Sequence, residues 1–196
     1  MFIDLLRETL RGIVELTADQ CSALESHYNL LVKWNRKLNL TSIQDPVEVV
    51  RRHYGESLFL AAQLPKGVLR IVDIGSGAGF PGFPVAILRP ECVVTLIESH
   101  QRKSVFLREA SRTIPNIRVL ARRAEEVARS GLQFDWAVSR AVSYEDLAPV
   151  LKVLAPSADL LTGREEPPAA MGLLWEAGFP LPWGNDRLMR KGRLAE

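Results

Sequence analysis

Three glycines that follow an apolar strand are the residues of this sequence best placed to do chemistry. The segment 69–74 is rich in β-branched apolar residues, as expected of a buried parallel strand, and carries Asp73 near its end. Gly75, Gly77 and Gly79 come next, with a single small residue in each gap. Glycines between a strand and a helix let backbone N–H groups approach a ligand closely. The spacing therefore predicts a nucleoside site at this glycine loop.

The order D-x-G-x-G-x-G separates two classes of nucleoside cofactor. Dinucleotide enzymes carry G-x-G-x-x-G, and their helix N-terminus faces a pyrophosphate. Here the spacing is G-x-G-x-G, and Asp73 stands two residues before the first glycine. S-adenosylmethionine carries a sulfonium and an ammonium group, which a carboxylate attracts, whereas a carboxylate repels a pyrophosphate. The order resembles the first motif of S-adenosylmethionine-dependent methyltransferases; a glycine turn that binds no cofactor is the alternative.

A second acidic residue, Glu98, ends the next apolar segment, 92–97. It lies about 20 residues past the glycine loop, where nucleotide-binding α/β units place a carboxylate on the ribose. A carboxylate can accept both ribose hydroxyl protons at once. We expect Glu98 to bind the ribose, with a solvated acid at a strand end as the alternative.

Composition limits the class of protein. A chain of 196 residues, 47% of them hydrophobic, suits one globular unit with an appendage. No apolar run approaches the length of a membrane span, and no basic stretch precedes Asp4, so we expect neither a membrane segment nor a secretory signal. Cys21 and Cys92 form no CxxC pair, and the chain has only three histidines. We therefore expect a reduced, cytoplasmic compartment and no metal site.

The basic residues are unevenly distributed along the chain. Nineteen of the 25 are arginines, and seven arginines and one lysine lie in residues 102–129, against three glutamates. Arginine pairs with phosphate through two parallel hydrogen bonds, so this clustering on a chain of net charge +2 indicates a nucleic-acid partner. A network of surface ion pairs would give the same pattern.

The patterns of apolar residues in the two parts of the chain predict the helices and strands that position these residues. Residues 1–66 are predicted to form an N-terminal helical cap, with a capping box at Thr17 and a helix start at Asp45. In residues 67–196, strands near 69–74, 92–98, 117–120, 134–139 and 158–162 alternate with helices at 81–89, 100–112, 123–129 and 143–152. This alternation predicts a doubly wound α/β fold with a mostly parallel, Rossmann-like sheet. Ligands bind at the carboxyl ends of such strands, where Asp73, Glu98 and Arg140 lie.

Four blocks of residues carry a resemblance to a known family. They are 33–35 (Lys-Trp-Asn) with 39–42 and 45–46, 52–53 (Arg-His) with 56–57, 72–84 with 89–91, and 139–141 (Ser-Arg-Ala). On these blocks the chain resembles, over about residues 20–150, the bacterial small-subunit ribosomal RNA methyltransferase G family, also called glucose-inhibited division protein B. The resemblance implies methyl transfer from S-adenosylmethionine to N7 of a guanine in small-subunit (16S) ribosomal RNA. We expect the enzyme to be a monomer.

The resemblance also implies roles for individual residues. Gly75 and Phe80 would line the cofactor, and Ala124 and Glu125 would approach its adenine. Arg140 would border the cofactor and face the RNA, and Arg123 is a second candidate for catalysis or RNA contact. Guanine N7 has an in-plane lone pair and needs no deprotonation, so the catalytic task is mainly positioning. A methyltransferase of this fold with another substrate, and a noncatalytic RNA- or nucleoside-binding protein, are the alternatives.

The C-terminal end departs from the family pattern. Thr162-Gly163-Arg164 stands where the family usually has a Lys-Gly pair, and Arg187-Leu188-Met189 runs directly into further basic residues. We therefore expect a closing strand that is short or absent, with Arg164 as the candidate to replace the lysine charge. In the cap, His53 either contacts the site or is a structural histidine.

Overall fold

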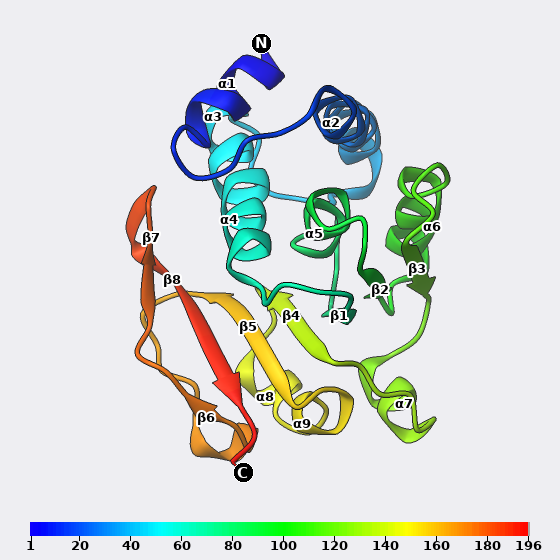
Figure 1. The fold of residues 1–196 in the computed structure, drawn as a ribbon. Coiled ribbons are helices and arrows are strands. Elements are labelled where there is room, and N and C mark those ends of the chain that lie inside the picture. Colours follow the sequence, from blue (N-terminus) through cyan, green and yellow to red (C-terminus); the bar gives the residue numbers. More distant parts are fainter. Residues whose placement is uncertain (196) are drawn as a thin grey trace.

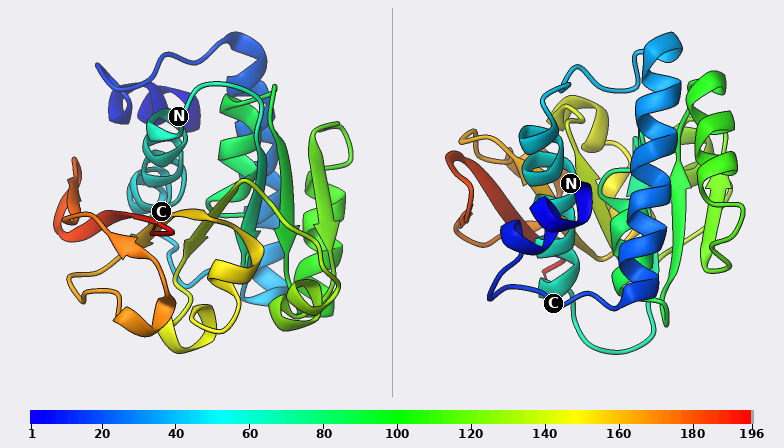
Figure 2. Two further views of the ribbon diagram at one scale, coloured as in Figure 1. Left: turned by 60° about the horizontal axis from the view of Figure 1, so that its bottom comes forward. Right: turned by 90° about the horizontal axis from the view of Figure 1, so that it is seen from above.

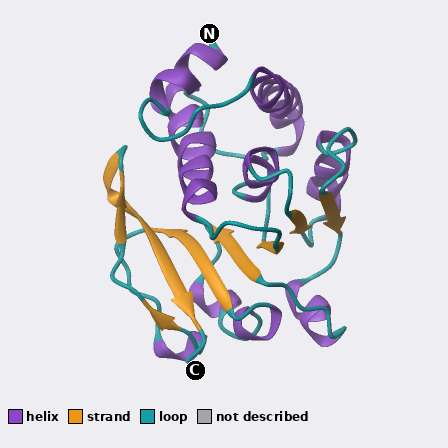
Figure 3. Ribbon diagram, in the orientation of Figure 1, coloured by secondary structure: helices purple, strands orange, loops and turns teal. Residues whose placement is uncertain are grey.

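A central eight-stranded sheet organises the computed structural model, which describes residues 1–195 apart from the side chain of Asn185. Its strands are β1 Arg70–Ile74, β2 Val93–Ile97, β3 Ile117–Leu120, β4 Trp136–Arg140, β5 Ser157–Thr162, β6 Leu174–Trp175, β7 Phe179–Leu181 and β8 Gly184–Arg193. The order is β3-β2-β1-β4-β5-β8-β6, and β7 pairs with β8 (Figure 1, Figure 3). Strands β1 to β5 are parallel, and β8 is antiparallel to its neighbours. The predicted mostly parallel α/β fold is confirmed.

Helices cover both faces of the sheet. On one side lie α1 Phe2–Thr9, α2 Ala18–Leu38, α3 Pro46–Glu48, the π-helical turn η1 Val49–Gly55, α4 Glu56–Gln63, α5 Gly82–Leu88 and α6 Gln101–Ala110 (Figure 1, Figure 2). On the other lie α7 Ala124–Arg129, α8 Tyr144–Leu147 and α9 Leu151–Leu154. A short 3₁₀ turn, Ala169–Met171, precedes β6. No helix within residues 1–195 is long and apolar enough to cross a membrane.

The helix starts follow local chemistry. Thr17 and Gln20 exchange side-chain and backbone hydrogen bonds at 2.9 and 3.2 Å, which is the predicted capping box at the start of α2. The Asp45 carboxylate accepts from the N–H of Glu48, at 2.9 Å, at the start of α3. The single helix predicted over 143–152 is wrong: Pro149, which has no backbone N–H, separates α8 from α9.

The helices of residues 1–63 and the sheet share one apolar core. Leu24, Leu31 and Tyr54 from the helices are buried in the same cluster as Ile71 and Leu96 from the strands. Each such side chain contributes about 1.5–3 kcal/mol when it leaves water. Packing against the sheet therefore holds these helices in place above the glycine loop.

The prediction of a short or absent closing strand is wrong. Strand β8 has ten residues and pairs with β5 from Ser157↔Arg193 to Thr162↔Leu188. The run of basic residues obscures the strand pattern in the sequence, but in the structure two of these side chains form hydrogen bonds with other parts of the fold. Arg190 is 3% exposed and donates to the Arg164 carbonyl at 3.0 Å, and Lys191 donates to the Gln63 carbonyl at 3.1 Å.

Candidate functional site

The glycine loop leaves β1 and turns at the carboxyl edge of the sheet. Gly75, Gly77 and Gly79 have φ values of +72°, +57° and +93°, in the left-handed region that favours glycine. The N–H groups of Gly75 and Ser76 donate to the Ile97 carbonyl, both at 3.0 Å, and tie the loop to β2. A Cβ added at Gly75 would lie 2.5 Å from Val142 Cγ2, so this position has no room for a side chain. These contacts fix the conformation of the loop.

Glu98 follows β2 and braces the same loop. Its Oε2 accepts from the N–H of Gly77 at 2.9 Å, and its Oε1 accepts from the N–H of His100 at 2.7 Å. The side chain is 8% exposed. Each carboxylate oxygen can accept a second hydrogen bond, so Glu98 keeps capacity for two hydroxyl donors.

Two cavities meet at this carboxylate. The central cavity has a volume of about 430 Å³ and the side cavity about 200 Å³, and Gly75 and Glu98 line both of them. The predicted site residues Gly77, Phe80 and Arg140 also line the central cavity. The predicted residues Arg123, Ala124 and Glu125 also line the side cavity. The structure thus brings eight of the predicted site residues to two neighbouring cavities that share Gly75 and Glu98.

Two predicted site residues, Asp73 and Gly79, line neither cavity. Asp73 is fully buried beneath the loop, and its Oδ2 accepts from the N–H of Gly82 at 2.9 Å. Burial raises the pKa of this carboxyl to about 7. Gly79 packs against Phe83 and His27, where a Cβ would lie 3.2–3.3 Å from their atoms. Direct contact of Asp73 or Gly79 with the cofactor therefore stays a prediction.

Arg140 and Arg123 differ in how firmly they are held. Arg140 ends β4, and its Nη1 donates to the backbone carbonyl of Arg52. Burial lowers the pKa of the Arg140 guanidinium to about 10, which leaves it protonated at neutral pH. Arg123 is the exposed residue just before α7 and is free of side-chain hydrogen bonds to other residues in the range 1–195.

Two histidines join the N-terminal helices to the loop. His53 lines the central cavity, stacks on Phe80 with ring centroids 4.6 Å apart, and bonds through Nε2 to Thr41 Oγ1 at 2.8 Å. His27 bridges Tyr54 and the loop, with Nδ1 2.7 Å from the Tyr54 hydroxyl and Nε2 3.0 Å from the Ala78 carbonyl. A carbonyl only accepts, so Nε2 carries the proton and Nδ1 accepts from Tyr54.

Both histidines are neutral at physiological pH. Burial lowers the pKa of His27 to about 4, and burial together with the Arg140 charge lowers the pKa of His53 to about 2. The sequence analysis missed His27, because a histidine between Leu24 and Leu31 reads as part of the buried helix stripe. Nothing local in the sequence shows that the stripe faces a cofactor loop.

The C-terminal edge supplies a third hollow, of about 230 Å³, beside the central cavity. Thr162 and Arg164 line it together with Arg187, which pairs with the buried Glu56 at 3.0 Å. Arg164 points to the surface and pairs with Asp186 at 2.7 Å; both side chains are more than two-thirds exposed.

The strand order, the glycine loop after β1 and the acid after β2 define a Rossmann-like methyltransferase fold. Solved structures agree on the fold: Aeropyrum pernix fibrillarin with natively bound S-adenosyl-L-methionine gives a TM-score of 0.55 at 16% identity, covering 70% of this chain and 73% of that one. Fibrillarin from Methanococcus jannaschii gives 0.54 at 18% identity, covering 66% and 67%.

Sequence comparison identifies the family. The family model described as rRNA small subunit methyltransferase G matches residues 20–159. A protein of that name from Nitrosomonas europaea is 43% identical over 143 residues, which are 70% of this chain and 65% of that protein. Another, from Xanthomonas campestris pv. campestris, is 38% identical over 173 residues, covering 83% and 79%. The chain belongs to the rRNA small subunit methyltransferase G family, and it is a methyltransferase.

Proposed function

We propose that the protein transfers a methyl group from S-adenosylmethionine to N7 of a guanine in small-subunit ribosomal RNA. One observation supports N7 of the guanine as the atom that accepts the methyl group. Among the described residues that line the central cavity, Glu98 has the only carboxylate, and two N–H groups already hold it. The one histidine there, His53, has a pKa of about 2, so it is not a base at neutral pH. A nucleophile that needs no deprotonation suits such a cavity.

The residues present fit the methyl donor. The side cavity is lined by the apolar residues Ile97, Ala124 and Val142, which suit an adenine ring, and by polar and charged residues, among them Ser99, Arg122 and Asp146. Glu98 lines both cavities, where a ribose would lie. Gly75 lines both cavities, and the lack of a side chain there avoids a clash with Val142. Asp73 would act through the loop, by holding the N–H of Gly82, and not by direct contact.

S-adenosylmethionine supplies an electrophilic methyl group on a sulfonium. The protein contributes position and charge. Phe80, held between His53 and Tyr54, gives a flat apolar wall in the central cavity. Arg140 and Lys103 line the same cavity with cationic groups that suit a phosphate or the O6 edge of the guanine. Arg123, at the side cavity, is free to contact RNA. These roles rest on the placement and charge of the side chains, and Arg140→Ala tests the role of Arg140.

The choice of RNA as the substrate rests on the family and on the exposed arginines of residues 102–123. The relatives are named for small-subunit ribosomal RNA. We propose the same substrate for this chain, acting as a monomer in the cytoplasm, where bacterial ribosomal RNA lies.

The test is methyl transfer with labelled S-adenosylmethionine onto small-subunit RNA from a strain that lacks the endogenous enzyme. We expect one labelled base, mapped as N7-methylguanine, and a loss of turnover in Arg140→Ala that is much larger than any loss of S-adenosylmethionine affinity. Label on another atom or another molecule contradicts the substrate. Tight cofactor binding with no transfer to any RNA supports the noncatalytic alternative.

A further inference from the structure

A groove lies between α2 and α6, outside the cavities described above. Its volume is about 500 Å³. The two helices lie side by side (Figure 1, Figure 2) and line it with Leu30, Lys33 and Trp34 from α2 and with Val105, Arg108, Glu109 and Arg112 from α6. We call it the α2–α6 groove.

The charges of the groove are unbalanced. Three cations face one acid, Glu109, which lies 3.8 Å from Arg112. Lys33 and Arg108 are exposed, and neither makes a side-chain hydrogen bond or ion pair with any residue from 1 to 195. A groove of this charge attracts a polyanion, because each ammonium or guanidinium that meets a phosphate releases condensed counterions.

The floor of the groove is apolar and aromatic. The Trp34 ring is half-buried and meets Phe106 edge to face, with centroids 5.7 Å apart. Val105 beside it is 50% exposed. A basic groove with an aromatic ring in its floor is the arrangement that binds single-stranded nucleic acid, since the cations follow the backbone and a base stacks on the ring.

The groove is also connected to the site through the chain. The last turn of α2 leads directly to Leu40 and Thr41, which line the central cavity. Helix α6 begins three residues after Glu98, and its Lys103 lines the same cavity. Both helices that line the groove therefore join directly to residues that line the central cavity.

We propose that the α2–α6 groove binds a single-stranded segment of the substrate RNA that flanks the target base, with phosphates on Lys33 and Arg108 and a base on Trp34. The proposal rests on the proposed RNA substrate and adds a contact surface to it. A protein partner would need acidic side chains opposite these three cations, whereas RNA carries a phosphate at every nucleotide.

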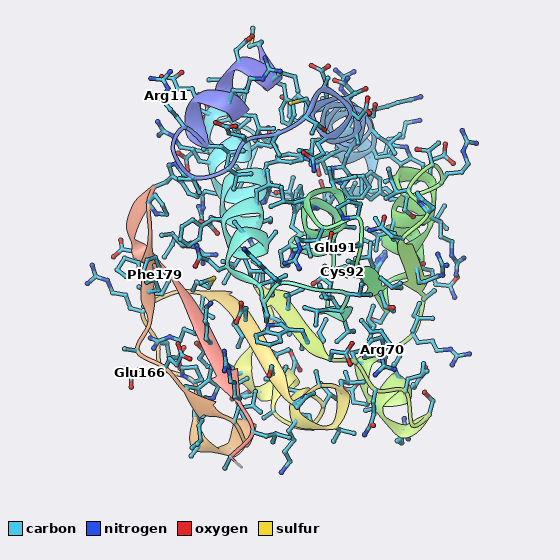
Figure 4. All side chains as sticks on the ribbon, in the orientation of Figure 1. Arg11, Arg70, Glu91, Cys92, Glu166 and Phe179 are labelled. Carbon is cyan, nitrogen blue, oxygen red and sulfur yellow. The ribbon has the colours of Figure 1, made fainter. Side chains whose placement is uncertain are left out.

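The first experiment compares two charge-matched double variants. Lys33→Ala with Arg108→Ala should raise KM for the RNA on the order of tenfold, with kcat and S-adenosylmethionine affinity unchanged. The slope of log binding constant against log salt should fall in magnitude by about 1.4, because each phosphate contact on a single strand contributes about 0.7. The control is Arg7→Ala with Arg11→Ala; Arg11 lies beside α1, on the other side of the molecule from α6 (Figure 4).

The second experiment does not depend on methyl transfer. Titration with a uridine oligonucleotide should quench tryptophan fluorescence, and Trp34→Phe should remove most of that quenching while the protein keeps its circular dichroism spectrum. Equal KM and equal salt slopes in the two double variants, or full quenching in Trp34→Phe, would overturn the proposal even if wild type methylates the RNA. A defect seen only with assembled subunits, and not with naked RNA, would assign the groove to a ribosomal protein and overturn it too. Oligonucleotide binding at Trp34 without methyl transfer would support the groove and count against the proposed function alone.

Discussion

The two walls of the methyltransferase site are held in opposite ways. The N-terminal wall, formed by α2 and η1 against the glycine loop, uses buried neutral groups such as His27, Tyr54 and His53. The C-terminal wall, formed by residues 162–190 at and beside β5, uses two charged pairs: Arg187 with Glu56, which is largely buried, and Arg164 with Asp186, which is exposed. Buried neutral contacts fix a geometry independently of salt, whereas exposed ion pairs are screened and are individually weak. The departure from the family pattern at Thr162 lies on the charged wall, two residues before the exposed Arg164.

The largest effect should come from the glycine loop that the N-terminal wall holds. Gly77→Val places a branched side chain in the central cavity, because the nearest atom to an added Cβ is the Gly75 carbonyl oxygen at 3.9 Å. We expect the Kd for S-adenosylmethionine to rise by about 100-fold or more, which corresponds to roughly 2.7 kcal/mol. Isothermal titration calorimetry measures it.

The control for that variant is Gly12→Val. Gly12 also has a positive φ, +76°, but lies in an open turn with nothing within 4 Å of an added Cβ. Both variants should lose stability to backbone strain, on the order of 1–2 kcal/mol. Only Gly77→Val should lose the cofactor; normal binding by a folded Gly77→Val protein would show that the loop has been misread.

The second prediction tests the neutral wall itself. His27→Ala removes a buried ring stacked on Phe83, at 4.2 Å between centroids, and leaves the Ala78 carbonyl without its donor. We expect a loss of about 3 kcal/mol in the free energy of unfolding, measured in urea, together with weaker cofactor binding. Tyr54→Phe removes one hydrogen bond from the same pair and should cost about 1–2 kcal/mol. A smaller loss in His27→Ala than in Tyr54→Phe would mean that the histidine does not anchor the loop.

The third prediction concerns pH, where the buried histidines of the N-terminal wall and two buried aspartates of the sheet, Asp73 in β1 and Asp159 in β5, oppose each other. Burial lowers the pKa values of His27 and His53 from 6.5 to about 4 and about 2. Below pH 6.5 the unfolded chain therefore binds two protons that the folded chain does not bind, which lowers the free energy of unfolding. Asp73 and Asp159 have pKa values raised by burial from 3.8 to about 7, so below pH 7 the folded chain holds two protons that the unfolded chain releases. Near pH 5 the two effects cancel, and the unfolding free energy of wild type should be nearly flat.

Single substitutions should break this balance in opposite directions. Asp159→Asn removes one of the two protons that the folded chain holds and the unfolded chain releases. The free energy of unfolding of this variant should therefore fall on acidification by about 1.4 kcal/mol per pH unit near pH 5. His27→Ala removes one of the two protons that only the unfolded chain binds, so the free energy of unfolding of this variant should rise on acidification with a similar slope. Urea unfolding at several pH values measures both, and parallel curves for wild type and the two variants would contradict the balance.

Sequence reasoning succeeded where the chemistry is local and periodic. The glycine loop, Glu98 and the Thr17 capping box each depend on residues at fixed short spacings, so their positions could be predicted. The closing strand could not be predicted in this way. Arg190 pairs with Glu166 and Lys191 donates to the Gln63 carbonyl, and both partners lie far from the strand in the sequence. Asp73 shows the same limit: the sequence places it at the strand end, but only the fold shows that Gly82 holds it under the loop.

The smallest effect should come from Arg164 on the charged wall. Its pair with Asp186 is exposed, with side-chain exposures of 71% and 80%, and such pairs contribute about 0–1 kcal/mol. We expect Arg164→Ala to change turnover by no more than about twofold, against the sharp loss in Arg140→Ala. Asp186→Ala sharpens the comparison, because it frees the Arg164 guanidinium without removing it. If Arg164 replaces the family's lysine as an RNA contact, Asp186→Ala should tighten RNA binding and Arg164→Ala should weaken it, both more strongly at low salt. If both variants match wild type in a salt series, the lysine position contributes no charge to this enzyme, and the substrate is held by Arg140 and the N-terminal wall.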